Sequence, residues 1–392
     1  MSMKTLSKKM LAVVAAGAMT MGLAMPAFAA DPSTTPDNTN NAKEAYIKKT
    51  YNTEVNKPMK FNFTATQVTT GNYIVTDAVT CTIPSIEFTS TDLNGGEGTY
   101  TKLSDKITFG TFPQAGKYEY TVTESETTDP VVTNNDYVKL IMSQAEYKMD
   151  VYVVENTSGT LEIDKILVTK TKNDKGEADS TTGKVDIGNN KDNNGFNFTN
   201  TYVQEAGTGP DPSTPDPTYN DNGALKVSKT IDAQDGTPST TDTFSFTATF
   251  AFPKGTDATT LGGVKGNGTA VELTDGTYTF NLKHNKSLKF TGLPVGTKIT
   301  VTETGAANYK GSAKVVLNGV EKTPAPAASK YNELLKAVDQ EKLGQNKNTV
   351  DVTNTYNYVP TTGIIMNTLP YVLMIALCGA ALFGFVAFKR RR

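Results

Sequence analysis

Two sets of lysine, glutamate and asparagine recur along the chain, and these residue types together could form an amide bond between side chains. The sets are Lys49, Glu124 and Asn200, then Lys229, Glu303 and Asn354. The lysine and the glutamate are 75 residues apart in the first set and 74 in the second. The matched spacing indicates that each set, here called a trio, serves the same purpose.

A buried trio would have a specific chemistry. An apolar environment favours the neutral forms of both the amine and the carboxylic acid. A neutral lysine is a nucleophile, and a protonated glutamate can polarise the asparagine carbonyl and relay protons while ammonia leaves. The product would be an intramolecular isopeptide bond, formed because the fold holds the groups in contact. The alternative is that each lysine and glutamate is an ordinary solvated residue at a strand end.

Side-chain alternation predicts that the trios point into a core. In a strand, residues two apart share a face, and each trio residue continues an apolar face. The apolar residues that precede them on these faces are Ile47, Val122 and Phe198 for the first trio and Val227, Val301 and Val352 for the second. Unpaired charges in such positions would weaken both cores, so the pattern favours convergence of the three groups.

The trios belong to two long repeats. Residues 61–66, Phe-Asn-Phe-Thr-Ala-Thr, recur as Phe-Ser-Phe-Thr-Ala-Thr at 244–249, and Thr-Asn-Thr-Tyr occurs at 199–202 and 353–356. Both copies are rich in Thr, Val, Tyr and Phe in period-two runs broken by Gly, Asn, Asp and Pro, which is typical of β-sandwiches. The sequence therefore predicts an all-β protein with two tandem Ig-like β-sandwich domains.

Composition divides the chain into six segments. A Pro/Gly-rich stretch in the middle is expected to run as a semi-extended linker, and a polar stretch near the start as a disordered leader. One short helix is expected at 329–343, where Tyr331, Leu334, Leu335 and Val338 would share a face. The expected segments are a signal peptide 1–29, the leader 30–43, a first domain 44–202, the linker 203–221, a second domain 222–358 and a sorting signal 359–392.

Both ends of the chain carry export signals. Lysines precede an apolar run that ends at Ala27-Phe28-Ala29, which predicts cleavage after Ala29. At the other end, Val-Pro-Thr-Thr-Gly at 359–363 precedes an uncharged stretch at 369–388, predicted to be a transmembrane helix, and a basic tail. This order resembles the sortase cell-wall sorting signal, which implies cleavage between Thr362 and Gly363. A plain single-pass membrane anchor is the alternative.

Charge and rare residues exclude several functions. The two ends hold seven of the 38 basic residues and none of the 40 acidic ones, which leaves 31 basic against 40 acidic residues and a net charge of −9. Nucleic acid is therefore not an expected partner. His284 is the only histidine and is expected in an exposed hairpin; Cys81 is expected to be a core thiol. We expect no metal site, no cofactor and no enzymatic activity beyond self-catalysed bond formation.

With the trios and the sorting motif, the chain resembles two-domain streptococcal-type backbone pilins with isopeptide linkage domains, which implies that its two Ig-like β-sandwich domains are related to the Cna B type. The resemblance implies bonds Lys49–Asn200, assisted by Glu124, and Lys229–Asn354, assisted by Glu303. It also implies a covalent homopolymer of identical subunits made by sortase and anchored to the cell wall, with minor pilins, peptidoglycan and a host surface as further partners.

The sequence identifies the lysine that would join one subunit to the next less clearly than it identifies the trios. The aromatic-led Tyr-Pro-Lys motif common in pilins is absent. In two-domain relatives the linking lysine precedes the bond-forming asparagine of the first domain, which implies Lys191, with Lys184 as the alternative. A monomeric wall-anchored adhesin or accessory pilin would need no such lysine and is the competing function.

Overall fold

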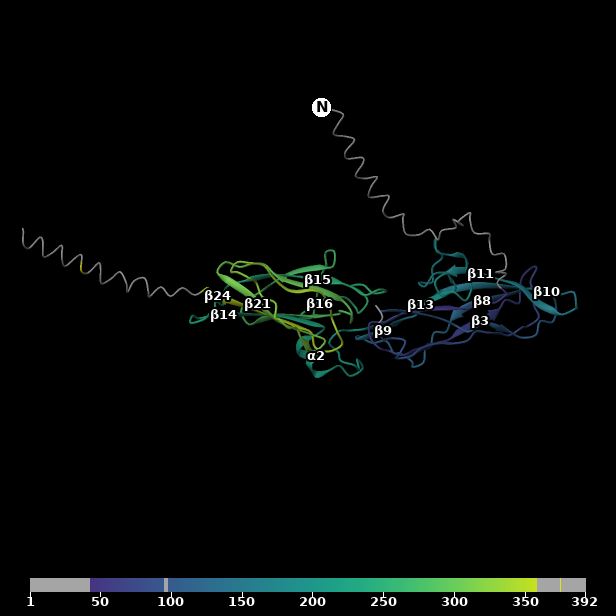
Figure 1. Ribbon diagram of the computed structural model, residues 1–392, viewed down its shortest axis with the longest axis horizontal. Coiled ribbons are helices and arrows are strands. Elements are labelled where there is room, and N and C mark those ends of the chain that lie inside the picture. The colour runs from purple at the N-terminus through teal and green to yellow at the C-terminus, as the bar shows by residue number, and fades with distance from the viewer. Residues whose placement is uncertain (1–42, 95–97, 358–373, 375–392) are drawn as a thin grey trace, which may run out of the picture.

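The computed structural model describes residues 43–94, 98–357 and 374, and nearly all of the regular secondary structure in this part of the chain is β-strand. The all-β prediction is confirmed. The strands form two groups that follow one another along the long axis of the molecule (Figure 1). The strands of the N-terminal half lie within residues 48–204 and those of the C-terminal half within residues 225–356.

Two main sheets and two short ribbons form the N-terminal half. The four-stranded sheet has the order β6-β1-β13-β9 and the five-stranded sheet the order β12-β11-β10-β8-β3, while β2 pairs with β5 and β4 with β7. The bounds are β1 Lys48–Asn52, β2 Met59–Phe61, β3 Phe63–Gln67, β4 Cys81–Thr82, β5 Ile86–Phe88, β6 Thr99–Leu103, β7 Thr108–Phe109, β8 Gly116–Glu124, β9 Val138–Ile141, β10 Glu146–Glu155, β11 Leu161–Lys172, β12 Gly183–Val185 and β13 Asn197–Gln204.

Two sheets form the C-terminal half. The seven-stranded sheet has the order β17-β16-β19-β14-β24-β21-β22 and the four-stranded sheet the order β18-β15-β20-β23. The bounds are β14 Leu225–Asp232, β15 Phe244–Ala251, β16 Lys265–Gly266, β17 Thr269–Ala270, β18 Thr277–Leu282, β19 Lys286–Thr291, β20 Lys298–Glu303, β21 Tyr309–Leu317, β22 Val320–Glu321, β23 Leu335–Lys342 and β24 Thr349–Tyr356.

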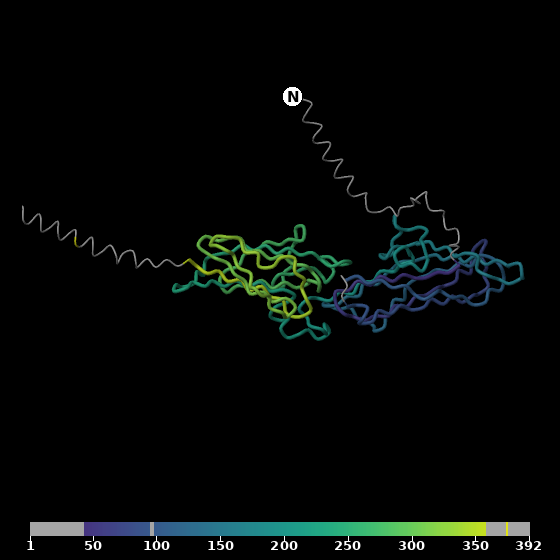
Figure 2. Tube along the Cα trace, viewed as in Figure 1, coloured from purple at the N-terminus to yellow at the C-terminus, as the bar shows by residue number. Residues whose placement is uncertain are grey.

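The first and last strands of each half lie side by side. β1 pairs in parallel with β13, and β14 pairs in parallel with β24. A parallel pair needs a long crossover, and here the whole remainder of each half forms that connection. In each half this pair lies inside its sheet and not at an edge. Figure 2 shows the chain passing from the N-terminal half, in purple to teal, to the C-terminal half, in green to yellow. This topology joins residues more than a hundred positions apart in the sequence.

The core of each half lies between its two main sheets. Alternating residues of β8 and β15 point inward, with Tyr118, Tyr120 and Val122 fully buried in the first case and Phe246 and Ala248 in the second. Aromatic rings join opposite sheets: those of Phe250 in β15 and Phe290 in β19 have centroids 5.3 Å apart. Such pairs bury large apolar areas and stabilise the contact between the two sheets.

The short helix expected at 329–343 is wrong. Residues 335–342 form β23, which pairs antiparallel with β20 at the edge of the four-stranded sheet. Leu335 and Ala337 are buried on one face, as alternation in a strand requires, and a register shift brings Val338 inward as well, whereas Leu334 is exposed. The unpaired backbone of β20 offers this segment a hydrogen-bonding partner, which outweighs its local helical pattern.

Residues 203–221, predicted to run as a semi-extended linker, are folded instead. β13 continues to Gln204, α2 spans Pro217–Asn222, and the segment between them contacts the C-terminal half. The buried carboxyl group of Glu205 accepts hydrogen bonds from the Tyr219 hydroxyl at 2.7 Å and from the Gly292 N–H at 2.6 Å. The Gly207 N–H donates to the Gly344 carbonyl oxygen at 3.1 Å. These bonds satisfy backbone groups that a solvated linker would leave to water.

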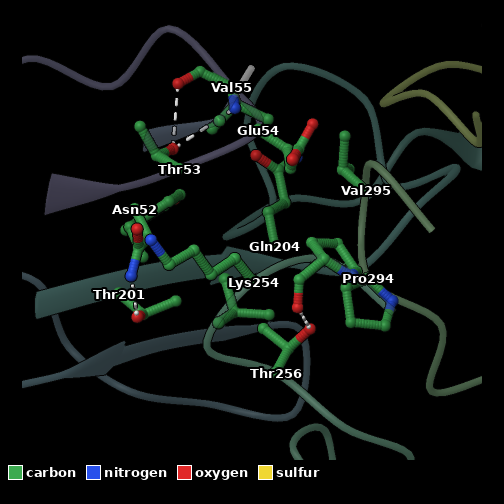
Figure 3. Close-up of a pocket in the computed structure, with 14 residues that line it drawn as sticks. Asn52, Thr53, Glu54, Val55, Thr201, Gln204, Lys254, Thr256, Pro294 and Val295 are labelled. Atoms are coloured by element: carbon green, nitrogen blue, oxygen red, sulfur yellow. Dashed lines mark hydrogen bonds between the residues drawn. The ribbon is translucent and has the colours of Figure 1, made fainter. Parts of the chain in front are cut away.

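Direct contacts also join the two halves. Lys342 donates to Glu54 at 2.8 Å, and the Gln345 amide donates to the Gln204 side chain at 3.0 Å. Figure 3 shows residues of both halves around one small cavity, with Asn52 and Thr201 on one side and Pro294 on the other. The cavity has a volume of about 10 Å³, close to what a single water requires. The joint is therefore closely packed.

The signal peptide, most of the leader and the sorting signal with Thr362 and Gly363 lie outside the described residues. Within the described part of the chain, the structure contains no helix of the length and apolar character needed to cross a membrane.

Candidate functional site

The first trio spans the core of the N-terminal half. Lys49 lies on the inner face of β1 between Ile47 and Tyr51, and all three side chains are fully buried. Asn200 lies on the inner face of the neighbouring strand β13 and is also fully buried. Glu124 ends β8 in the opposite sheet and is 8% exposed as a residue. Alternation in three strands thus directs all three side chains into one interior space.

The carboxyl group of Glu124 lies between the amine and the carboxamide. Lys49 Nζ is 2.8 Å from Glu124 Oε1 and donates a hydrogen bond to Oε2 at 2.9 Å. Asn200 Nδ2 donates to Oε1 at 2.9 Å. One acid therefore contacts both the attacking group and the leaving group of the proposed amide exchange, which is the position a proton relay requires.

The second trio repeats this arrangement in the C-terminal half. Lys229 of β14, Glu303 of β20 and Asn354 of β24 are all buried. Lys229 Nζ lies 2.9 Å from Glu303 Oε1, and Asn354 Nδ2 donates to the same oxygen at 2.9 Å. The close approach of Lys229 falls outside hydrogen-bond geometry. The structure therefore brings together the members of both sets that the sequence singled out.

Burial lowers the pKa values of both lysines and raises those of both glutamates, which favours the uncharged form of each group. Desolvation lowers the pKa of the Lys49 ammonium from its ordinary 10.5 to about 8, although Glu124 opposes the shift. Desolvation lowers the pKa of Lys229 to about 8 in the same way. It also raises the pKa of Glu124 and of Glu303, against the opposing effect of the lysines. These shifts favour the neutral amine and the protonated acid relative to the same groups in water.

Each lysine also lies against an aromatic ring that the sequence analysis did not assign to the site. Lys49 Nζ is 4.4 Å from the centroid of the Phe61 ring, and Lys229 Nζ is 4.3 Å from that of Phe244. These two residues occupy the same position in the duplicated Phe-x-Phe-Thr-Ala-Thr motif. The rings exclude water from the amines and hold them in place. The recurrence of this motif in both copies was the signal that could have identified them.

The two candidate linking lysines are both exposed. Lys191 lies in a turn before β13, and Lys184 lies in β12. Lys184 and Asn190 line a groove of about 870 Å³, which is bounded on its other sides by β11 and by the first residues of the described chain, including Glu44. Lys191 directly follows Asn190, so both candidates belong to one surface region.

The remaining reactive residues serve the fold. Burial raises the pKa of the Cys81 thiol to about 12, so little thiolate exists at neutral pH. His284 is half-buried, not exposed as expected, because its Nδ1 accepts a hydrogen bond from the Ile231 N–H at 2.9 Å. That bond ties the β18–β19 turn to β14, close to Lys229.

Comparisons with known proteins give matches to one family model, to a curated protein and to solved structures. A family model described as a domain of unknown function (DUF7601) matches residues 223–356. A curated pilin of Streptococcus pyogenes serotype M1 is 36% identical over 110 residues, which are 28% of this chain. The matched segment is 31% of that pilin, so the chain spans about a third of the length of the curated relative it matches.

Solved structures with detectable similarity include a major pilin from Streptococcus pyogenes. It is 20% identical, with 80% of this chain and 98% of that chain covered, at a TM-score of 0.31. A pilus-presented adhesin is 19% identical, with 54% of this chain and 37% of that chain covered, at a TM-score of 0.26. The neighbours of this chain in sequence and in structure thus include pilins of Streptococcus pyogenes.

Proposed function

We propose that this chain is a structural subunit of a covalently polymerised pilus on the surface of a Gram-positive bacterium. The observation that carries the proposal is the buried Lys–Glu–Asn trio found in both halves, in which one glutamate carboxyl group contacts both the lysine amine and the asparagine amide nitrogen. Burying a charged pair without further benefit is often no more stable than an apolar core. Two buried trios would therefore stabilise the fold most if the lysine and the asparagine of each formed a covalent bond.

The reaction proposed for each trio is an intramolecular isopeptide bond. Lys49 would join Asn200 with Glu124 as the assisting acid, and Lys229 would join Asn354 with Glu303 in the same role. Each bond would tie the first strand of its half to the last. Two bonds of this kind would let force pass through one pair of strands while most of each half stays outside the load path.

The domains, the signal peptide and the sorting signal of the precursor are proposed from its sequence. We take the two halves as tandem Ig-like β-sandwich domains at 44–202 and 222–358, preceded by a signal peptide at 1–29. The motif at 359–363 would be cleaved by sortase between Thr362 and Gly363, and the apolar stretch with its basic tail would hold the precursor in the membrane until then. The product would be a cell-surface polymer anchored to the wall.

The groove beside Lys184 and Lys191 is the proposed acceptor region. β24 runs to the end of the C-terminal half that points away from the N-terminal half (Figure 1). The sorting motif that follows β24 would therefore leave from the end opposite to the half that holds the groove. Head-to-tail contact between copies would place Thr362 of one subunit near the lysines of the next.

An immunoblot of cell-wall extracts tests this function. A sortase-dependent ladder of covalent multimers is expected, and deletion of the sortase should collapse it to monomer. A strain with intact sortases that shows wall-linked monomer alone would instead favour the monomeric adhesin or accessory pilin.

A further inference from the structure

The two trios differ at the oxygen of the asparagine carboxamide. Asn200 Oδ1 accepts a hydrogen bond of 2.7 Å from the backbone N–H of Ser143, and both residues are buried. Asn354 Oδ1 is equally buried but has no hydrogen-bond partner within the described part of the chain. The attacking amine and the assisting acid are therefore common to both sites, whereas a donor to the carbonyl oxygen is found in the N-terminal one.

The neighbouring strand explains this difference. β9, which pairs with β13, ends opposite Thr201, and the chain then turns through Ser143 toward β10. β21, which pairs with β24, continues as a regular strand past Asn354, with Gly311 opposite it. Because the chain leaves the sheet just before Asn200, a backbone N–H is free to point at its side chain.

Asp174, in the turn after β11, holds the Ser143 loop in place. Its Oδ1 accepts from the Ser143 hydroxyl at 2.5 Å and from the Thr199 N–H at 2.8 Å. Its backbone oxygen accepts from the Gln144 N–H at 3.0 Å. Asp174 thus fixes the loop that contains Ser143 relative to the backbone immediately before Asn200.

We propose that the Ser143 N–H is an oxyanion donor for isopeptide formation at Asn200 and that Asp174 is the positioning residue that aims it. The inference rests on the isopeptide function proposed above. It predicts that the N-terminal bond forms faster than the C-terminal bond, which lacks this donor. Removal of one donor from an oxyanion hole typically slows an acyl transfer about 100-fold to 1000-fold.

The reaction balances without an external reagent. Neutral Lys49 Nζ attacks Asn200 Cγ, and the carbonyl electron pair moves onto Oδ1, where the Ser143 N–H stabilises the negative charge. Glu124 takes a proton from Nζ and gives one to Nδ2. The Cγ–Nδ2 bond then breaks and ammonia leaves, so that one secondary amide replaces one primary amide and one amine.

The test follows both bonds in the same full-length molecule. The chain is made by cell-free synthesis, samples are quenched over time, and mass spectrometry of digests measures each linked peptide against its unlinked forms. In the wild type, the Lys49–Asn200 peptide should appear first. In Asp174→Ala, the Lys49–Asn200 bond should form at least about tenfold more slowly. The Lys229–Asn354 bond, which serves as the internal control, should form at its wild-type rate.

Three further variants separate positioning from damage to the fold. Asp174→Asn keeps an acceptor oxygen but removes a negative charge that opposes the oxyanion, so its rate should equal or exceed that of the wild type. Ser143→Ala removes the hydroxyl that binds Asp174 and should slow the N-terminal bond. Asp179→Ala loosens the same hairpin, where Asp179 contacts Asn173 and Thr181, and should leave the rate unchanged.

The outcomes distinguish the two proposals. Equal rates in the wild type and Asp174→Ala, or equal slowing of both bonds, would overturn the role of Ser143 and Asp174 while leaving isopeptide formation intact. A wild-type chain that forms neither linked peptide would overturn the isopeptide function itself.

Discussion

Asn200 lies directly opposite Tyr51 in the parallel register of β1 and β13. Tyr51 comes two residues after Lys49, so the lysine and the asparagine project from the same face of neighbouring strands. The relationship recurs in the C-terminal half, where Asn354 lies opposite Ile231, two residues after Lys229. The pairing of the first strand with the last is thus what brings each amine to its carboxamide.

Intact mass measures bond formation directly. The mature protein should weigh less than its sequence by the mass of two ammonia molecules, because each trio releases one. Glu124→Ala and Glu303→Ala should each restore one ammonia, and the double variant both, since the proton relay is lost. The matched control is Glu87→Ala, which alters an exposed glutamate of β5 and should keep the full deficit. A wild-type mass equal to the sequence mass would refute both bonds.

Loss of one bond should destabilise one half. The Lys229–Asn354 bond would close a loop of more than a hundred residues, which by analogy with disulfides contributes about 5 kcal/mol. Asn354→Ala should therefore lower the melting temperature of the C-terminal half by on the order of 20 °C and expose its lysines to trypsin. Calorimetry and limited proteolysis check both. A variant as resistant as the wild type would mean that the bond is absent or carries no stability.

The pH dependence of stability should differ between bonded and unbonded chains. In Asn200→Ala, Lys49 stays an amine whose pKa is about 8 when folded and 10.5 when unfolded. Between these values the unfolded chain binds the extra proton, so the free energy of unfolding should rise with pH, by at most about 1.4 kcal/mol per pH unit. In the bonded wild type, Lys49 is an amide and does not titrate.

The stability gap between the wild type and Asn200→Ala should consequently narrow from pH 8 to pH 10.5. Urea unfolding at several pH values measures it, and groups common to both chains cancel in the comparison. A gap that stays constant over this range would show either that folding does not lower the pKa of Lys49 in the variant or that Lys49 also titrates in the wild type because no bond has formed.

Polymer assembly tests the linking lysine. Lys191→Arg keeps the positive charge but removes the nucleophile, because a guanidinium group remains protonated. The ladder in wall extracts should collapse to wall-linked monomer, while secretion and the mass deficit from the internal bonds persist. Lys175→Arg, at another exposed lysine of the same half, is the control. An undiminished ladder in Lys191→Arg would move the assignment to Lys184, the other lysine of the groove region.

The amino-acid sequence alone determined the all-β class, the duplication and the inward direction of the six trio residues. The duplication follows from the recurrence of the motifs. The all-β class and the inward direction depend on local geometry, because successive residues of a strand alternate between faces whatever the strand pairs with. The buried positions of Lys49, Glu124 and Asn200 could therefore be inferred from their apolar neighbours two residues away.

Only the tertiary structure decided which elements meet. The parallel pairing of β1 with β13, the ring of Phe61 beneath Lys49 and the Ser143 N–H at Asn200 all depend on contacts between distant segments. Residues 335–342 became a strand, and residues 205–222 folded onto the C-terminal half, because partners elsewhere in the chain offered hydrogen bonds that the local pattern does not encode. Local alternation directs a side chain inward; long-range register determines what it touches there.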